Sequence, residues 1–188
     1  TSLLTTNNDA TCGGSATGGG SGTTGGGTGT TGGGTGSTGG GSGTCIPPDG
    51  VVIRSVYTYG GSSNATYSYD YVELHNRSSS PISLSGWSLQ YGAGTSNGFT
   101  LVANLSGSIP AGGYFLVRGG GSSSSPAPVT QDLNLSTLTL GGDKGKLALV
   151  KSQMQLPNVC PAASSIGASS NIADVVAWGG ATCSPLGS

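Results

Sequence analysis

The chain has 188 residues, of which 38 are Gly and only 13 carry a formal charge, six Lys or Arg and seven Asp or Glu. A net charge of −1 gives no long-range field that would attract a nucleic acid or an anionic membrane, so we expect no nucleic-acid partner. One His and few acids leave little material for acid–base or metal chemistry, so we expect no enzymatic activity, no metal and no cofactor. Apolar runs are also too short to span a bilayer, and no membrane span is expected.

Residues 1–48 are predicted to form an extended arm rather than a packed domain. No charged residue lies between Asp9 and Asp49, and Gly13–Gly43 contains 18 Gly in 31 residues. Triplets of Gly recur every seven residues, but no apolar side chains repeat with them, which excludes a coiled coil. Gly does not occupy every third position either, which excludes a collagen helix.

Three interpretations of this arm stay open. A flexible linker of this length would span about 30 Å. An ordered arm would need neighbours, because Gly loses more backbone entropy on ordering than any other residue. Other copies of the chain, a hairpin, or glycans on the Thr hydroxyls would each serve. A third alternative is binding of ice or a mineral through Thr28–Thr30 and Thr35–Ser37. The candidate O-glycosylation sites are Thr23, Thr24, Thr28, Thr30, Thr31 and Thr35.

Four cysteines in a chain dominated by Ser, Thr and Gly indicate an oxidising, extracellular or cell-surface location. Cys12 and Cys45 bracket the Gly-rich repeat. A bond between them would close a loop of about 33 residues and destabilise the unfolded state by about 3–4 kcal/mol. Nearness in sequence favours the pairs Cys12–Cys45 and Cys160–Cys183. Four cysteines allow three pairings, and bonds between subunits also stay open.

Residues 49–188 are predicted to form a β-sandwich. Short apolar stretches with period-two alternation recur there between Gly, Pro, Asn and Ser, and no stretch of ten or more residues has helical periodicity. Eight short strands at this spacing indicate an all-β domain of two packed sheets. The expected strands are Val51–Tyr57, Tyr71–Asn76, Gly86–Tyr91, Gly98–Val102, Tyr114–Arg118, Leu133–Leu135, Lys146–Val150 and Ile172–Ala177.

Several segments of this region follow one another in a specific order. The most distinctive are Asp70–Asn76, with the sequence DYVELHN, and Ser80–Tyr91, which contains Trp87. The others are Val51–Tyr57, Gly60–Tyr67, Ser108–Val117, Gly145–Val150 and Ile172–Gly179. Together they resemble the lamin tail domain, an immunoglobulin-like β-sandwich of nuclear lamins and of many secreted bacterial proteins. The resemblance implies a non-catalytic interaction or display module.

A cluster of tyrosines is the strongest candidate for a contact surface. Five tyrosines fall within 15 residues, interleaved with Gly, Ser, Asn and Thr. This composition is typical of antibody paratopes, in which rigid aromatic side chains alternate with small adaptable ones. An alternative is that two or three of them border the core and the rest are ordinary surface residues. The candidate contact residues are Tyr57, Tyr59, Tyr67, Tyr69 and Tyr71.

Other polar residues of this region are better explained by structure than by chemistry. Asp70 and Glu73 could suggest a calcium site, but a strand places them on opposite faces and no further oxygen ligands lie nearby in the sequence. His75 has no partner arranged for nucleophilic catalysis. Four Asn-x-Ser/Thr triplets are candidate N-glycosylation sites. Their acceptors are Asn64, Asn76, Asn104 and Asn134.

These observations favour a secreted structural protein. We expect it to be a subunit of a self-assembling filament or surface layer, in which the Gly-rich arm and the tyrosines contact other copies of the chain. The alternative is a binding or adhesion module for carbohydrate or a surface protein, with the arm as a spacer. Electron microscopy of the native material would distinguish these two hypotheses.

Overall fold

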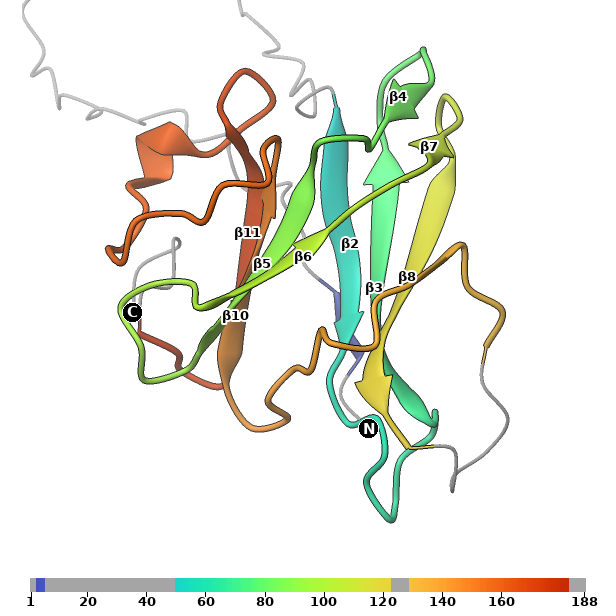
Figure 1. Cartoon of the computed structure of the whole chain (residues 1–188), viewed down its shortest axis with the longest axis vertical. Coiled ribbons are helices and arrows are strands. Elements are labelled where there is room, and N and C mark those ends of the chain that lie inside the picture. Colours follow the sequence, from blue (N-terminus) through green and yellow to red (C-terminus); the bar gives the residue numbers. More distant parts are fainter. Residues whose placement is uncertain (1–2, 6–49, 123–128, 183–188) are drawn as a thin grey trace, which may run out of the picture. The chain divides into compact units, whose positions relative to one another are not determined.

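A computed structural model describes residues 3–5, 50–122 and 129–182, the first three as backbone only. Two sheets face each other, and one turn of 3-10 helix, Ala163–Ser165, is the only helix of the described residues (Figure 1). This architecture confirms the predicted all-β sandwich. Some of the sequence predictions lie outside the described residues. They concern the Gly-rich repeat with its candidate O-glycosylation sites, and Cys12, Cys45 and Cys183.

The first sheet has five strands in the order β1-β2-β3-β8-β9. All neighbouring strands are antiparallel except β8 and β9, which are parallel. The strands are β1 Leu3–Thr5, β2 Val51–Tyr57, β3 Tyr69–Asn76, β8 Tyr114–Gly121 and β9 Leu133–Asn134.

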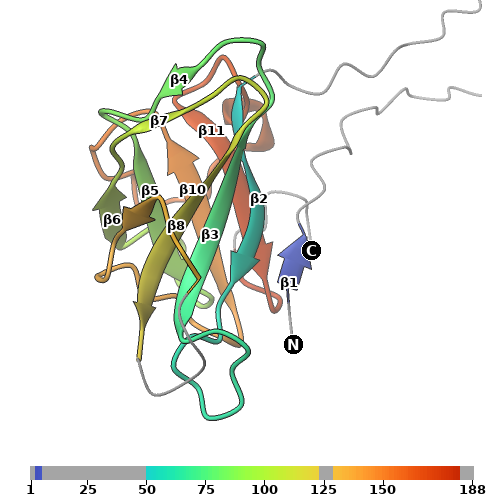
Figure 2. The same ribbon diagram turned by 90° about the vertical axis from the view of Figure 1, so that its right-hand side faces the viewer.

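The second sheet has four antiparallel strands in the order β11-β10-β5-β6. A small pair, β4 and β7, lies at one end of the sandwich (Figure 2). The strands of the second sheet are β5 Ser88–Ala93, β6 Leu101–Asn104, β10 Gly145–Val150 and β11 Ile172–Trp178, and the pair consists of β4 Ile82–Ser83 and β7 Ser108–Ile109.

The core lies between the two sheets because alternate side chains of each strand point inward. Leu74 of β3, Leu89 of β5 and Leu147 of β10 are fully buried in it. Trp178 also packs there, and its indole Nε1 donates a hydrogen bond of 2.8 Å to the carbonyl oxygen of Gly141. The core therefore follows from the period-two pattern that predicted the strands.

The outer face of the second sheet is covered by the chain itself. Phe99, Val150 and Val175 form a second apolar cluster with Leu156 and Ile166 packed against it. β10 is consequently buried on both faces, including the Lys146 side chain.

The buried Lys146 is held by backbone oxygens. Its ammonium group donates to the carbonyl oxygens of Ala93, at 3.1 Å, and Ser96. Burial lowers the pKa of Lys146. The hydrogen bonds compensate in part for the loss of water around the amine.

All eight expected strands are present, seven of them with shifted ends, and three short ones were missed. β2 matches the expected range residue for residue. β8 continues through Gly119–Gly121, which a propensity argument assigns to a turn. The strand needs glycine there because a Cβ on Gly119 would collide with the carbonyl oxygen of Leu138. The three missed strands, β1, β4 and β7, have only two or three residues each.

Candidate functional site

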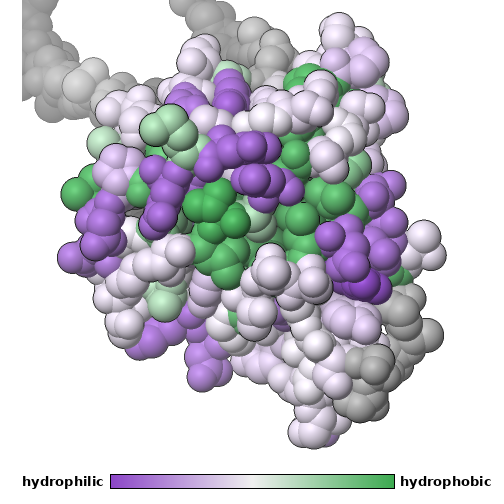
Figure 3. Space-filling model, viewed as in Figure 1, coloured by the Kyte–Doolittle hydropathy of each residue, from purple (hydrophilic) through white to green (hydrophobic). Residues whose placement is uncertain are grey.

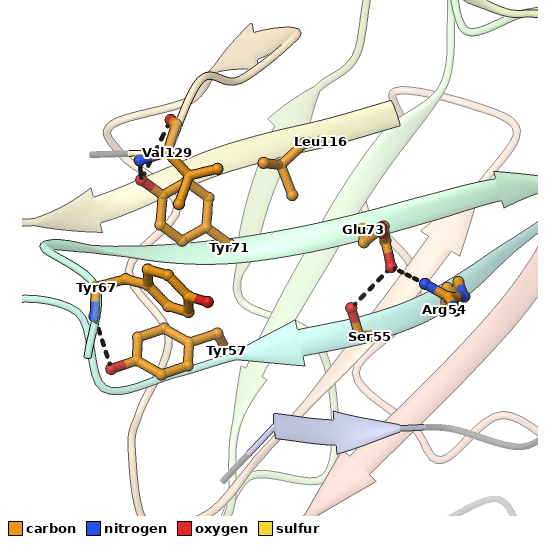
Figure 4. A pocket seen from close by; sticks show the side chains of 8 residues that line it. All are labelled: Arg54, Ser55, Tyr57, Tyr67, Tyr71, Glu73, Leu116 and Val129. Atoms are coloured by element: carbon orange, nitrogen blue, oxygen red, sulfur yellow. Dashed lines mark hydrogen bonds and ion pairs between the residues drawn. The ribbon is translucent and has the colours of Figure 1, made fainter. Parts of the chain in front are cut away.

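Three of the five predicted contact tyrosines come together on the outer face of the first sheet. Tyr57 and Tyr71 are direct neighbours across β2 and β3, and Tyr67 reaches over them from the loop between these strands. The Tyr67 ring is edge-on to both, with centroids 5.1 Å from Tyr57 and 5.9 Å from Tyr71 (Figure 4). Such T-shaped pairs are favourable beyond the area they bury. We call Tyr57, Tyr67 and Tyr71 the tyrosine cluster.

Hydrogen bonds hold the two strand tyrosines in place. The Tyr57 hydroxyl accepts from the backbone N–H of Thr66 at 2.8 Å and of Tyr67 at 3.3 Å. The Tyr71 hydroxyl accepts from the backbone N–H of Val129 at 2.9 Å. These two side chains are buried, whereas 37% of Tyr67 is exposed. Tyr67 is therefore the member of the cluster that a partner can reach, on a base that is already ordered.

A pocket of about 310 Å³ opens beside the cluster. One wall is apolar and includes Leu116 and Val129, and the other carries an ion pair. Arg54 Nη1 lies 2.8 Å from Glu73 Oε2, which also accepts a hydrogen bond of 3.2 Å from the Ser55 hydroxyl. The bond and charge of Glu73 raise the pKa of Arg54, so the guanidinium remains charged. The pocket thus combines ring surfaces with a polar rim, an arrangement typical of binding sites.

Aromatic side chains continue along the same face beyond the ion pair. Tyr114 of β8 is half exposed and stacks on His75, with ring centroids 4.4 Å apart. The Arg54 guanidinium lies over the Tyr114 ring, 5.0 Å from its centroid. We call Arg54, His75 and Tyr114, together with the tyrosine cluster, the aromatic face.

A different side of the domain is seen in Figure 3. There the apolar side chains gather in patches that hydrophilic and weakly polar residues separate, so this side presents no continuous apolar surface. Of these two sides, the aromatic face is the better-defined candidate contact surface.

The other two predicted tyrosines are not members of the cluster. Tyr59 is exposed in the loop after β2, and Tyr69 packs under Arg118, whose guanidinium carbon is 4.5 Å from the ring centroid. Sequence reasoning missed five pocket residues, because strand register decides which side chains meet. Alternation alone would have placed Glu73 on the outer face. The five are Arg54, Ser55, Glu73, Leu116 and Val129.

Asp70 and Glu73 are separated by the sheet and do not form a carboxylate pair. Asp70 is buried, and its two oxygens accept hydrogen bonds from the backbone N–H of Gly60 at 3.0 Å and of Leu140 at 2.9 Å. Burial raises its pKa to about 6, against the lowering effect of the two hydrogen bonds. The carboxylate thus fastens two loops to β3.

One candidate glycan acceptor is incompatible with the folded domain. Asn76 is fully buried, and its amide nitrogen donates to the carbonyl oxygens of Ser80, Ile109 and Pro110. A glycan on this nitrogen would break these bonds and has no room, so the prediction for Asn76 is corrected to a structural role. The other three acceptors are exposed, and their modification stays a prediction for Asn64, Asn104 and Asn134.

The described part of the chain contains one cysteine, Cys160, and it is not a free thiol. The preferred pairs Cys12–Cys45 and Cys160–Cys183 each include a residue outside that part and stay predictions. Within residues 3–5, 50–122 and 129–182, no three His, Cys, Asp or Glu side chains are grouped to hold a metal ion. The same residues include no helix of the length and apolarity that a membrane crossing requires.

The facing sheets and their connections define an immunoglobulin-like β-sandwich. Residues 46–179 match the family described as Lamin Tail Domain, and the chain belongs to that family. The resemblance seen in the sequence is confirmed for this domain, which is a non-catalytic fold type. No curated protein matches the chain.

Proposed function

We propose that the chain is an extracellular structural protein that self-assembles into a filament or surface layer and uses the aromatic face as a subunit contact. The observation that carries the proposal is the asymmetry of the sandwich. Chain segments cover the outer face of the second sheet, whereas the first sheet presents Tyr67 and Tyr114 to solvent. Tyr and Arg are the residue types that dominate protein interfaces.

The Gly-rich arm supplies the second part of the proposal. Its sequence has no charged residue over Gly13–Gly43, so no charge repulsion keeps two arms apart. Glycine backbones can approach each other closely, and their N–H and C=O groups then need a neighbouring chain as hydrogen-bond partner. Self-association provides such neighbours at any point of contact between copies. A repeating module with an arm also suits head-to-tail contacts that propagate without closing.

The test is analytical ultracentrifugation and electron microscopy of the chain and of two tyrosine variants. Tyr67→Ala removes the exposed ring of the cluster, and Tyr59→Ala is the matched control because the two rings are equally exposed, 37% and 38%. We expect Tyr67→Ala to weaken association at least about tenfold, as loss of an interface anchor does, and Tyr59→Ala to have little effect. A chain that stays monomeric at millimolar concentration would contradict the proposal.

A second candidate function is carbohydrate binding at the same face, and the pocket is the observation that favours it. A ring-lined pocket beside the Arg54–Glu73 ion pair offers stacking surfaces together with donors and acceptors for hydroxyl groups. A glycan array tests it. Saturable binding that Tyr67→Ala abolishes and Tyr59→Ala retains would support the second function, and no binding to any glycan would oppose it.

A further inference from the structure

The strand β1 is attached to the sandwich in an unusual way. It pairs with the edge of β2 over three residues only, Leu3 with Tyr57, Leu4 with Val56 and Thr5 with Ser55. Residues 6–50, 45 in number, separate β1 from β2 along the chain. A connection of this length is long enough for β1 to reach the β2 edge of a neighbouring copy.

The edge that receives β1 belongs to β2, which the rest of the sandwich holds in place. β3 pairs with the inner edge of β2 along its whole length. On the outer edge, the Asp174 carboxylate of β11 accepts the backbone N–H of Ile53 at 2.8 Å, so only the stretch from Ser55 onward takes β1. This edge is a ready site for strand addition, in which backbone hydrogen bonds recruit an extended segment.

We propose that β1 of one copy pairs with β2 of a second copy, so that strand exchange joins neighbouring domains. This inference rests on the proposed function and names the segment and the edge that make the contact. Each copy donates one β1 and accepts one, so exchange that does not close between two copies is head-to-tail and can propagate into a filament. Because Leu3 is the partner of Tyr57, the exchanged strand runs beside the tyrosine cluster and brings the two copies together at the aromatic face.

The concentration dependence of this exchange follows from the tether. For a tether of 45 residues, the effective concentration of β1 at its own β2 is on the order of millimolar. Exchanged pairs therefore amount to roughly one in a hundred at 10 µM and become comparable with unexchanged pairs near 1 mM. Additional contact at the aromatic face would shift this balance toward exchange.

Cysteine cross-linking of full-length chains tests the exchange. Thr5→Cys is made in one chain and Ser55→Cys in another, because these positions are Cα partners. The chains are mixed, oxidised at 10 µM and at 1 mM, and the new bond is mapped by mass spectrometry. The matched control replaces Ser55→Cys with Ser83→Cys, on an exposed residue of β4.

We expect a covalent heterodimer linked between positions 5 and 55 whose yield rises steeply with concentration, and none between positions 5 and 83. A synthetic peptide with the sequence of residues 1–8, added in excess, should lower the yield of the heterodimer by competing for the edge of β2. The double variant with both substitutions in one chain should cross-link within the monomer at 10 µM, which shows that both sites are folded and reactive. Heterodimer yields no higher than the control at 1 mM, with an intact intramolecular cross-link, would overturn the inference.

The same samples separate this inference from the proposed function. Fibres that form without a bond between positions 5 and 55 would leave self-assembly standing and refute strand exchange. Heterodimers without larger assemblies would support strand exchange and refute the filament.

Discussion

At the scale of single residues, buried polar groups fix the loops around the first sheet. Asp70 and Asn76 lie on one strand, β3, and their side chains together make hydrogen bonds to backbone groups of six other residues. Each such group is costly to bury unless all its hydrogen-bonding capacity is used. Substitution of either side chain should therefore change the stability of the domain more than its small size suggests.

The raised pKa of Asp70 predicts a pH dependence of stability with an unusual sign. The carboxyl titrates at about 6 in the folded domain against 3.8 ordinarily, so the folded state holds more protons than the unfolded state between these values. The contribution of Asp70 to the free energy of unfolding is then largest below pH 4 and falls as the pH rises through 6, by up to about 3 kcal/mol.

Urea unfolding of the chain and of Asp70→Asn at pH 4 and pH 7 measures this contribution. The difference in stability between the two proteins should change by about 1–3 kcal/mol across the interval, because Asn has no proton to lose. A difference that does not change with pH would show that Asp70 titrates near its ordinary pKa.

Asn76→Asp predicts a large loss of stability from an almost isosteric change. The substitution removes the amide donors and places a carboxylate against three carbonyl oxygens in a buried site. We expect the free energy of unfolding to fall by about 3 kcal/mol or more. Asn104→Asp, on an exposed residue of β6, is the control and should change it by less than about 0.5 kcal/mol. Equal effects at both positions, measured by thermal or urea unfolding, would disprove the structural role of Asn76.

At the scale of elements, β8 depends on its three consecutive glycines. A Cβ on Gly119 would meet the carbonyl oxygen of Leu138 closer than real Cβ contacts allow, and would also lie 3.2 Å from Cβ of Asp70. The adjacent Gly120 N–H donates to the same Leu138 oxygen at 2.8 Å. The glycines let the chain around Leu138 lie directly against β8.

Gly119→Ala should therefore displace the segment that carries Leu138 and destabilise the fold by about 1–3 kcal/mol. Gly142→Ala is the matched control, because a Cβ there has contacts of 3.4 Å or longer. Thermal unfolding of the two variants measures the difference. Equal melting temperatures would mean that β8 can move away from Leu138 without cost.

The sequence predicts where the strands lie better than it predicts which side chains of different strands meet. The short apolar stretch Val51–Tyr57 was enough to locate β2. It did not give the inner face, because the shift between Ile53 and Ser55 puts Val56 rather than Ser55 into the core. The pairing of Tyr57 with Tyr71 was not predictable, since it depends on a register shift between Ile53 and Ser55 that no local pattern encodes. Val129 is farther still from the tyrosines in the sequence, and only the packing of the whole sheet brings it onto the Tyr71 hydroxyl.

At the scale of the whole molecule, the distribution of basic residues makes the cysteine pairing directly testable. All six Lys and Arg lie between Arg54 and Lys151, so trypsin releases residues 1–54 and 152–188 as two large peptides. The first contains Cys12 and Cys45, and the second contains Cys160 and Cys183.

A tryptic digest of the denatured, unreduced chain should yield these two peptides separately, each lighter by two hydrogens than after reduction. That result is expected because the preferred pairs lie within single peptides. The reduced digest is the control. A species in which residues 1–54 are linked to 152–188 would refute the predicted pairs, and a species of doubled mass would indicate bonds between chains.

The five-stranded sheet ends on its two shortest strands, three residues in β1 and two in β9. Long open edges are the starting points of amyloid aggregation, because they template the addition of any extended chain. The short terminal strands leave few backbone groups for such growth. Proteolytic loss of residues 1–5 would uncover Ser55–Tyr57 of β2, and would lengthen the open edge from which aggregation can start.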